Sequence, residues 1–101
     1  MKQVSQVIIE IIKAIPPGKI LTYGEIARRA GTPATARLVS YLLHSSSEKY
    51  CLPWHRVINS KGQISLTGMA GEEQKQKLLS EGIKIHSGKI DLEKYTYQGQ
   101  L

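Results

Sequence analysis

Few side chains in this sequence could act as nucleophile, base or metal ligand. One cysteine, Cys51, and three histidines, His44, His55 and His86, supply all of its thiol and imidazole groups. A single cysteine excludes an internal disulfide framework and argues against a zinc cluster built on cysteines. The histidines do not stand at metal-ligand spacing either, so we predict neither a metal nor a cofactor. Cys51 is then either a small structural thiol or an isolated nucleophile.

The charge balance favours a polyanionic partner. Fourteen Lys and Arg against eight Asp and Glu give a formal net charge of +6. Neutralising phosphates releases counterions from nucleic acid, so nucleic acid is one candidate partner. The same charge could equally serve solubility, because the basic residues are spread over both halves of the chain. No apolar stretch approaches the roughly 18 residues of a membrane span. We therefore expect a cytoplasmic protein without a membrane partner.

The length of 101 residues predicts a single domain, residues 1–101, with one modest core. The first element expected is a helix that presents one apolar face and ends at Pro16, Pro17 and Gly18. That face carries Val4, Val7, Ile8, Ile11, Ile12 and Ile15. A domain this small needs such a face inside, so we predict that it is core.

Two short helices around a glycine predict a helix-turn-helix over about residues 23–44. We expect an extended link at 20–22 and then a helix at 23–30 that stops at Gly31. The second helix has Thr32 as N-cap and Pro33 in its first turn, and a polar loop follows it at 45–50. The second helix has an apolar side of Leu38, Val39, Leu42 and Leu43 and a polar side of Arg37, Ser40, Tyr41 and His44. The polar side is either solvated or a DNA contact, and the preceding turn and the charge favour DNA.

The remaining third predicts small β elements around one helix. We expect a hairpin at 57–65 turning at 60–62, a flexible connection between Gly68 and Gly71, a helix at 72–81, and a second hairpin turning at 87–88 beside Lys84, Lys89 and Lys94. Gly82 in a left-handed conformation and Ile83 against Leu78 would close the helix as a Schellman motif. The fold class is thus mainly α with small β hairpins, and a helix-turn-helix followed by such a hairpin looks like a winged helix.

One segment resembles a known family. Pro53-Trp54-His55-Arg56-Val57 is similar to the Pro-Cys-His-Arg-Val motif of the O6-alkylguanine-DNA alkyltransferases, whose cysteine takes the alkyl group irreversibly. Further similar pieces stand in the family's order: Gly18-Lys19-Ile20, Thr22-Tyr23-Gly24-Glu25-Ile26-Ala27, Ala36-Arg37-Leu38-Val39, Lys75, Leu78-Leu79 and Glu81-Gly82. The resemblance covers nearly the whole chain. It corresponds to the family's C-terminal domain and implies a winged helix-turn-helix that binds DNA.

The resemblance also implies that the chain is not an enzyme and has no catalytic residue. His55 and Glu81 match the family's base and the residue that orients it, but Trp54 replaces the nucleophile. An indole has no lone pair for alkyl displacement, since its N–H only donates. The chain is therefore similar to the alkyltransferase-like proteins. These recognise O6-alkylguanine in duplex DNA without transferring the group and direct the lesion to nucleotide excision repair proteins.

The same resemblance implies the roles of individual residues. Arg37 would fill the space left by the extruded nucleotide, and Tyr23 would help to rotate it. The implied lesion pocket is Trp54, Tyr23, Pro53, His55 and Val57, and the implied DNA contacts are Arg37, Tyr23, Thr22, Ser40 and Tyr41. Trp54 either plugs the space of the missing thiol or contacts the alkyl group with its flat surface, and we favour the contact.

Ser46-Ser47 stands where the family usually has Asn-Pro. We expect a monomer that is associated with the nucleoid when bound to DNA. Two alternatives stay open: an active alkyltransferase that uses Cys51, and a winged-helix transcription factor that reads intact sequence.

Overall fold

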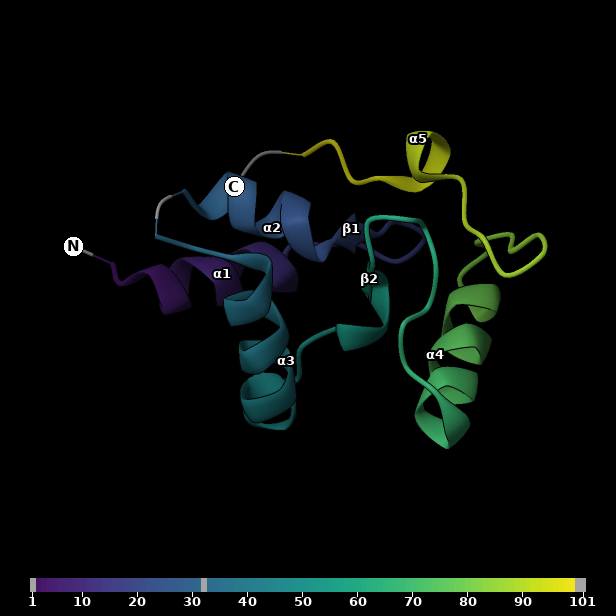
Figure 1. Ribbon diagram of the computed structural model, residues 1–101, viewed down its shortest axis with the longest axis horizontal. Coiled ribbons are helices and arrows are strands. Elements are labelled where there is room, and N and C mark those ends of the chain that lie inside the picture. The colour runs from purple at the N-terminus through teal and green to yellow at the C-terminus, as the bar shows by residue number, and fades with distance from the viewer. Residues whose placement is uncertain (1, 32, 100–101) are drawn as a thin grey trace.

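The computed structural model describes residues 2–31 and 33–99, and its regular structure is mainly helical. The elements are α1 (Val4–Lys13), β1 (Leu21–Thr22), α2 (Tyr23–Ala30), α3 (Ala36–Tyr50), the 3-10 turn η1 (Trp54–Arg56), β2 (Val57–Ile58), α4 (Gly68–Ser80) and α5 (Leu92–Tyr95). Helices α1 to α3 form one group, α4 stands apart from them, and β1 and β2 lie between (Figure 1). The predicted mainly helical class is confirmed.

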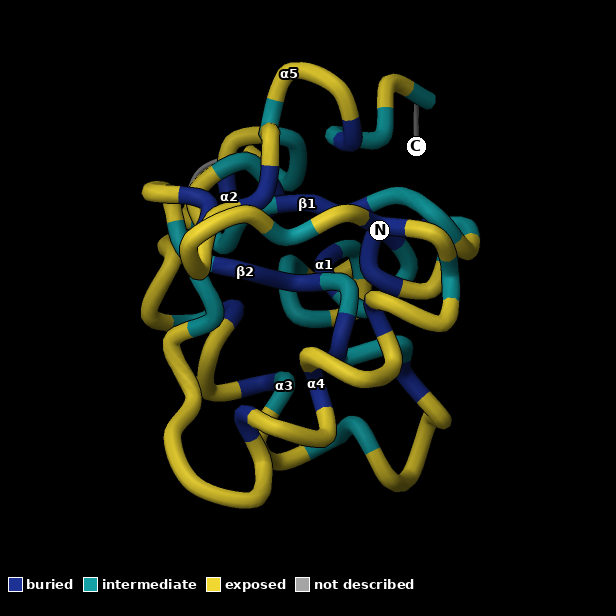
Figure 2. Tube along the Cα trace, turned by 90° about the vertical axis from the view of Figure 1, so that its right-hand side faces the viewer, coloured by how far each residue is buried: buried dark blue, intermediate teal, exposed yellow. Residues whose placement is uncertain are grey.

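The short strands separate two apolar clusters. β1 and β2 pair in parallel, with Leu21 opposite Val57. Successive side chains of a strand point to opposite faces, and accordingly Leu21 and Val57 join the cluster of α1, α2 and α3, whereas Ile20 and Ile58 join the cluster beside α4. The strands run through the buried middle of the molecule (Figure 2). This pair therefore fixes how α4 sits relative to the helix-turn-helix.

The first helix has the face that its periodicity predicts. Ile8, Ile11 and Ile12 are buried in the first cluster, and Ile15 follows them into it after the helix has ended. An amphipathic helix turns its apolar face toward the core, where other elements cover it. Here these elements are α2 and α3.

The helix-turn-helix is present. α2 has the predicted bounds, whereas the second helix begins at Ala36, after Pro33 and not around it, and ends at Tyr50. The Thr22 hydroxyl accepts from the Glu25 N–H at 3.1 Å and begins α2, and Gly31 ends it at a φ of 83°. Thr32, the predicted N-cap of the second helix, lies outside the described residues. The cap of α3 is Thr35, which accepts from the Leu38 N–H at 3.1 Å.

The predicted polar loop at 45–50 is wrong, because α3 continues to Tyr50. The Ser47 hydroxyl hydrogen-bonds to the Leu43 carbonyl within the helix. Serine at Ser46-Ser47 keeps the backbone N–H that a proline would lack, so nothing interrupts the helical ladder there. The helix ends instead at Cys51, which adopts the left-handed conformation at a φ of 52°.

The predicted turn at 60–62 is present, but the hairpin predicted around it at 57–65 is wrong. β2 pairs with β1, and Asn59 to Gln63 form a tight turn in which the Asn59 side chain accepts from the Lys61 and Gln63 N–H groups at 3.0 and 2.9 Å. Both residues of β2 are buried, as is typical of strands that pair in parallel.

Helix α4 begins at Gly68, before the predicted start at 72, so the flexible connection between Gly68 and Gly71 is wrong as well. Gly71 is buried inside the helix, where a Cβ would lie 2.5 Å from the Leu66 carbonyl oxygen. The predicted Schellman end is confirmed: Gly82 has a φ of 87°, and the Ile83 N–H donates to the Leu78 carbonyl at 3.1 Å.

The C-terminal segment returns over the first helix group (Figure 1). The predicted turn at 87–88 is present, closed by the reciprocal His86 and Lys89 backbone hydrogen bonds, but a four-residue helix, α5, follows it. Beyond α5, Ile20 exchanges backbone hydrogen bonds with the strip 95–97, and the Arg29 guanidinium donates to the carbonyls of Tyr97 and Gly99. None of the described helices has the length and apolarity needed to cross a membrane.

Candidate functional site

A hollow of about 380 Å³ opens between the helix-turn-helix and α4. Its wall combines the start of α2, one side of α3, η1, the link before α4 and α4 itself. The lining residues are Tyr23, Ser40, Leu43, His44, Ser47, Trp54, Leu66, Ala70 and Gln74. Its volume lies in the range of about 300–1,000 Å³ that is typical of small-molecule sites.

The α3 wall depends on the full length of that helix. Ser40, Leu43, His44 and Ser47 recur at three- and four-residue spacing, which places them on one helical face. Ser47 was missed from the sequence because its segment was predicted to be a loop. The spacing of Ser47 from Ser40 and Leu43 is the signal that could have found it.

Trp54 forms the opposite wall, and its ring is held by two neighbours. The His55 ring meets it edge-on, with centroids 6.2 Å apart and an interplanar angle of 88°. The Lys77 ammonium lies 5.4 Å from the Trp54 ring centroid and is also 3.4 Å from the Glu73 carboxylate. An edge-to-face aromatic pair and a cation over a ring are both attractive. The indole therefore has a defined place at the edge of the hollow.

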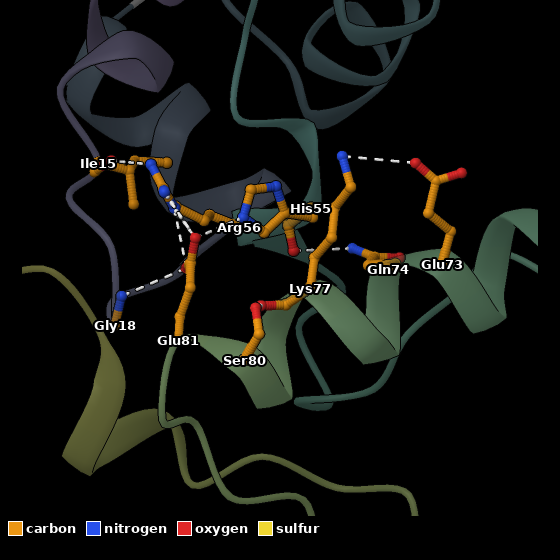
Figure 3. A network of polar contacts seen from close by, with 9 residues as sticks. All are labelled: Ile15, Gly18, His55, Arg56, Glu73, Gln74, Lys77, Ser80 and Glu81. Atoms are coloured by element: carbon orange, nitrogen blue, oxygen red, sulfur yellow. Dashed lines mark hydrogen bonds and ion pairs between the residues drawn. The ribbon is translucent and has the colours of Figure 1, made fainter.

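Beneath η1, the Glu81 carboxylate is the centre of a polar network (Figure 3). It accepts from Arg56 at 3.0 Å on one oxygen and 2.6 Å on the other, and the Gly18 N–H donates to it at 3.3 Å. The His55 Nε2 lies 2.8 Å from Glu81 Oε2. A further Arg56 nitrogen donates to the Ile15 carbonyl at 2.9 Å, so the network ties η1 to α4 and to the end of α1.

The charge state of Glu81 follows from these contacts. Burial raises the pKa of the carboxyl, but hydrogen bonds from Arg56, His55 and the Gly18 N–H outweigh burial and lower the pKa from 4.5 to about 2. The carboxylate can only accept, so His55 Nε2 carries the proton that it donates to Glu81. The His55–Glu81 pair inferred from the resemblance is thus present, and Arg56 is its missed third member.

Gln74 connects η1 to α4 through the backbone. The side chain is 2% exposed, and its Nε2 donates to the carbonyls of His55 at 3.1 Å and Val57 at 3.0 Å. The sequence did not predict that Gln74 is buried, because a polar side chain on a helix is normally expected to be solvent-exposed. Only the packing of α4 against η1 reveals it.

The structure brings together some of the predicted site residues. Tyr23, Ser40 and Trp54 line the hollow, whereas three residues assigned to the pocket, Pro53, His55 and Val57, are not among its lining residues. Pro53 is half-buried before η1, His55 is turned to Glu81, and Val57 is core. Of the remaining predicted DNA contacts, Arg37 and Tyr41 lie exposed on α3, and the Thr22 hydroxyl caps α2.

Cys51 does not line this hollow. It is exposed at the end of α3 and borders a neighbouring hollow of about 490 Å³ with His44, Ser47, Glu48, Leu52 and Trp54. Trp54, His44 and Ser47 line both hollows, whereas Tyr23 lines only the first and Cys51 only the second. Within residues 2–31 and 33–99, no group of three or more His, Cys, Asp or Glu could hold a metal ion.

The fold has a counterpart among solved structures. S. pombe Atl1, in complex with damaged DNA containing O6-carboxymethylguanine, matches with a TM-score of 0.82 and 34% identity, over 98% of this chain and 100% of that chain. Two relatives are both named DNA base-flipping protein. The one from Vibrio parahaemolyticus is 52% identical over 92 residues, 90% of this chain and 92% of its own length. The one from Escherichia coli is 47% identical over 89 residues, 87% of this chain and 69% of its own length.

These likenesses define the class as a small DNA-binding domain with the alkyltransferase-like fold. Residues 3–83 match the DNA-binding domain of 6-O-methylguanine DNA methyltransferase, and the chain belongs to this family. The resemblance drawn from the Pro53 to Val57 segment is confirmed.

The Glu81 network predicts a stability that depends on pH. Because folding lowers the pKa of Glu81 from 4.5 to about 2, its contribution is complete above pH 4.5 and is lost as the pH falls toward 2. Glu81→Gln leaves the Arg56 charge without its partner and should lower the free energy of unfolding at pH 7 by about 3 kcal/mol. Urea unfolding between pH 2 and pH 7 should show this difference shrinking below pH 4.5.

Glu73→Gln is the matched control on the same helix. Its carboxylate is 57% exposed and contacts only Lys77 among the described ion pairs, so the substitution should cost less than about 1 kcal/mol. A Glu81→Gln difference that stayed constant from pH 7 to pH 2 would contradict the role given to the ionised carboxylate.

Proposed function

We propose that this protein is a non-enzymatic sensor of O6-alkylguanine lesions in duplex DNA, which it binds by turning the nucleotide into the Trp54–Tyr23 hollow. The observation that carries the proposal is the composition of that hollow. It opens beside the polar side of α3, has aromatic walls from Tyr23 and Trp54, and includes no sulfur atom among its lining residues. Such a site can hold a base but offers no thiolate to accept an alkyl group.

Base extrusion requires compensation, since unstacking and unpairing cost a few kcal/mol. Contact of the alkyl group with an aromatic wall returns about 0.8 kcal/mol per buried methylene-sized group, so it supplements other contacts. The net charge of +6 supports phosphate binding, which supplies most of the affinity for any duplex. Arg37 and Tyr41, both exposed on α3 next to the hollow-lining Ser40, are the side chains we propose to reach the DNA.

The relatives support the same conclusion by their names. Two are named base-flipping proteins, and the matching structure of S. pombe Atl1 holds DNA with O6-carboxymethylguanine. By resemblance to alkyltransferase-like proteins, we further propose that this chain acts as a monomer in the cytoplasm, at the nucleoid when bound. We also propose that it directs the lesion to nucleotide excision repair proteins.

A binding titration tests the sensor function. Two duplexes that differ only in guanine or O6-methylguanine at one position are titrated at the same fixed salt concentration, because phosphate contacts depend on salt. We expect about tenfold or tighter binding to the alkylated duplex, since the alkylated base is more easily unpaired and its methyl group gains contact with Trp54. Equal affinities would overturn the proposal and favour a winged-helix transcription factor.

Arg37→Ala should weaken lesion binding more than binding to intact duplex. The guanidinium is proposed to stack into the space left by the extruded nucleotide, an interaction present only when a base is turned out. We expect a loss of about tenfold or more on the alkylated duplex, from stacking contributions of about 1–3 kcal/mol. Lys84→Ala, which removes one positive charge from the segment after α4, is the control. A similar loss on both duplexes for Arg37→Ala would reduce Arg37 to a phosphate contact.

An alkyl-transfer assay separates the sensor from an enzyme that uses Cys51. The protein is incubated with duplex carrying O6-methylguanine that is radiolabelled in the methyl group. We expect the label to stay with the DNA, because the exposed thiol of Cys51 lies outside the Trp54–Tyr23 hollow. Label that became bound to the protein, and disappeared in Cys51→Ser, would establish alkyl transfer and overturn the non-enzymatic assignment.

A further inference from the structure

A groove of about 670 Å³ lies between α1 and the end of α3. It belongs to the helix group from which α4 stands apart (Figure 1), and it shares no lining residue with the Trp54–Tyr23 hollow. The lining residues are Gln3, Ser5, Gln6, Ile9, Glu10, Lys13 and Tyr50. A ligand in this groove would therefore use none of the side chains that form the proposed base site.

Two ammonium groups converge on the ring of Tyr50 at this groove. The Lys13 Nζ, from the last turn of α1, lies 5.9 Å from the ring centroid, and the Lys49 Nζ lies 5.2 Å from it. Both lysines are exposed, and Tyr50 is 38% exposed. A cation over an aromatic ring is attracted to it, but two cations that share one ring repel each other. An anion bound beside both lysines would offset that repulsion.

The chain itself does not neutralise these two charges. Among residues 2–31 and 33–99, no carboxylate forms an ion pair with either lysine. Glu10, the acid in the groove, is paired with Lys2 at 2.7 Å. Glu48 precedes Lys49 in the sequence but lines the neighbouring hollow of about 490 Å³. The positive charge beside Tyr50 is thus complementary to a carboxylate from another molecule.

The mixed charge of the groove favours a peptide over nucleic acid. A duplex carries one phosphate charge for about every 1.7 Å of its axis, so phosphates along the groove would meet the Glu10 carboxylate. A peptide can instead place acidic side chains at Lys13 and Lys49 and lay its neutral backbone along α1. The amides of Gln3 and Gln6 both donate and accept, so they suit the N–H and C=O groups of such a backbone.

We propose that this groove binds an acidic, extended segment of a second protein, with carboxylates at Lys13 and Lys49 and the peptide against Tyr50. The biological role rests on the proposed function, because a sensor that leaves the alkyl group in place needs a second protein to remove the lesion. That protein requires a surface of the sensor other than the hollow that holds the base. The groove meets this requirement, since the two sites have no lining residue in common.

A labelled peptide tests the groove directly. The probe is a short peptide of alternating glutamate and serine with a fluorescein label, and the same peptide with glutamine for glutamate is its control. Both are titrated with the protein at about 0.15 M salt, where distant charges are largely screened. We expect only the acidic peptide to bind. It should shift the backbone amide NMR signals of Gln6 and Lys13 and leave those of Ala70 and Gln74 unchanged.

Two double variants with the same change in net charge locate the binding. Lys13→Gln/Lys49→Gln should weaken binding of the acidic peptide about fivefold, because each exposed charge pair contributes modestly. Lys84→Gln/Lys94→Gln is the matched control, since Lys94 also lies over a tyrosine ring, that of Tyr95 at 5.2 Å. The control should change peptide binding by less than about twofold. Neither double variant should alter the preference for O6-methylguanine over guanine duplex.

The outcomes are distinct. Equal weakening by the two double variants, or no binding of the acidic peptide at about 1 mM, would overturn the groove as a docking site. Displacement of the peptide by duplex, with a loss of duplex affinity in Lys13→Gln/Lys49→Gln that the control does not show, would assign the two lysines to DNA phosphates instead. Failure of the proposed function would look different, since the wild-type protein would then bind guanine and O6-methylguanine duplexes alike, whatever the peptide does.

Discussion

The Glu81 carboxylate is the interaction on which the arrangement of the site depends. It lies at the end of α4 and receives hydrogen bonds from Arg56 and His55 of η1 and from the Gly18 N–H after α1. Through Arg56 the connection extends to the Ile15 carbonyl. Three segments that are remote in sequence, namely the link after α1, η1 and the end of α4, thus meet at one ionised group. A partly buried charge of this kind is stable only when it is well paired, which restricts the residues around it.

The contacts of Glu81 help to explain how the short turn η1 can hold Trp54 at the hollow. The turn has only three residues, and its own backbone hydrogen bonds could not keep it in place. His55 and Arg56 hold it from one direction through Glu81, and Gln74 holds it from another through the carbonyls of His55 and Val57. The indole is the part of the turn left facing the hollow. The support of η1 comes from His55, Arg56 and Gln74, so it does not depend on which side chain stands at Trp54.

The parallel pair of β1 and β2 is the second organising feature. It is only two residues long on each side, yet it divides the apolar interior into two clusters and joins the helix-turn-helix to the part of the chain that carries η1 and α4. The hollow lies where these two parts meet, between α3 and α4. In the proposed function, a nucleotide turned out of the duplex enters the hollow between these two parts of the molecule.

The sequence by itself determined the features that rest on short-range physics. The periodicity of Ile8, Ile11 and Ile12 predicted α1, the glycine at Gly31 marked the turn of the helix-turn-helix, and Gly82 predicted the end of α4. Helix propensity, capping and the periodicity of an apolar face depend on residues that are close in sequence. They can therefore be recognised from the sequence alone. The motif around Trp54 likewise identified the family without any coordinates.

Only the tertiary structure decided which remote groups meet. Local sequence patterns did not predict three features of the site. These are the pairing of β2 with β1, the continuation of α3 to Ser47 and beyond, and the burial of Gln74 against η1. Each depends on how much apolar surface and how many polar partners the whole fold supplies, because a short strand, a helix end or a lone glutamine is nearly neutral in isolation. Packing therefore decides which side chains form the wall of the hollow. The chemical nature of each of these side chains is given by the sequence.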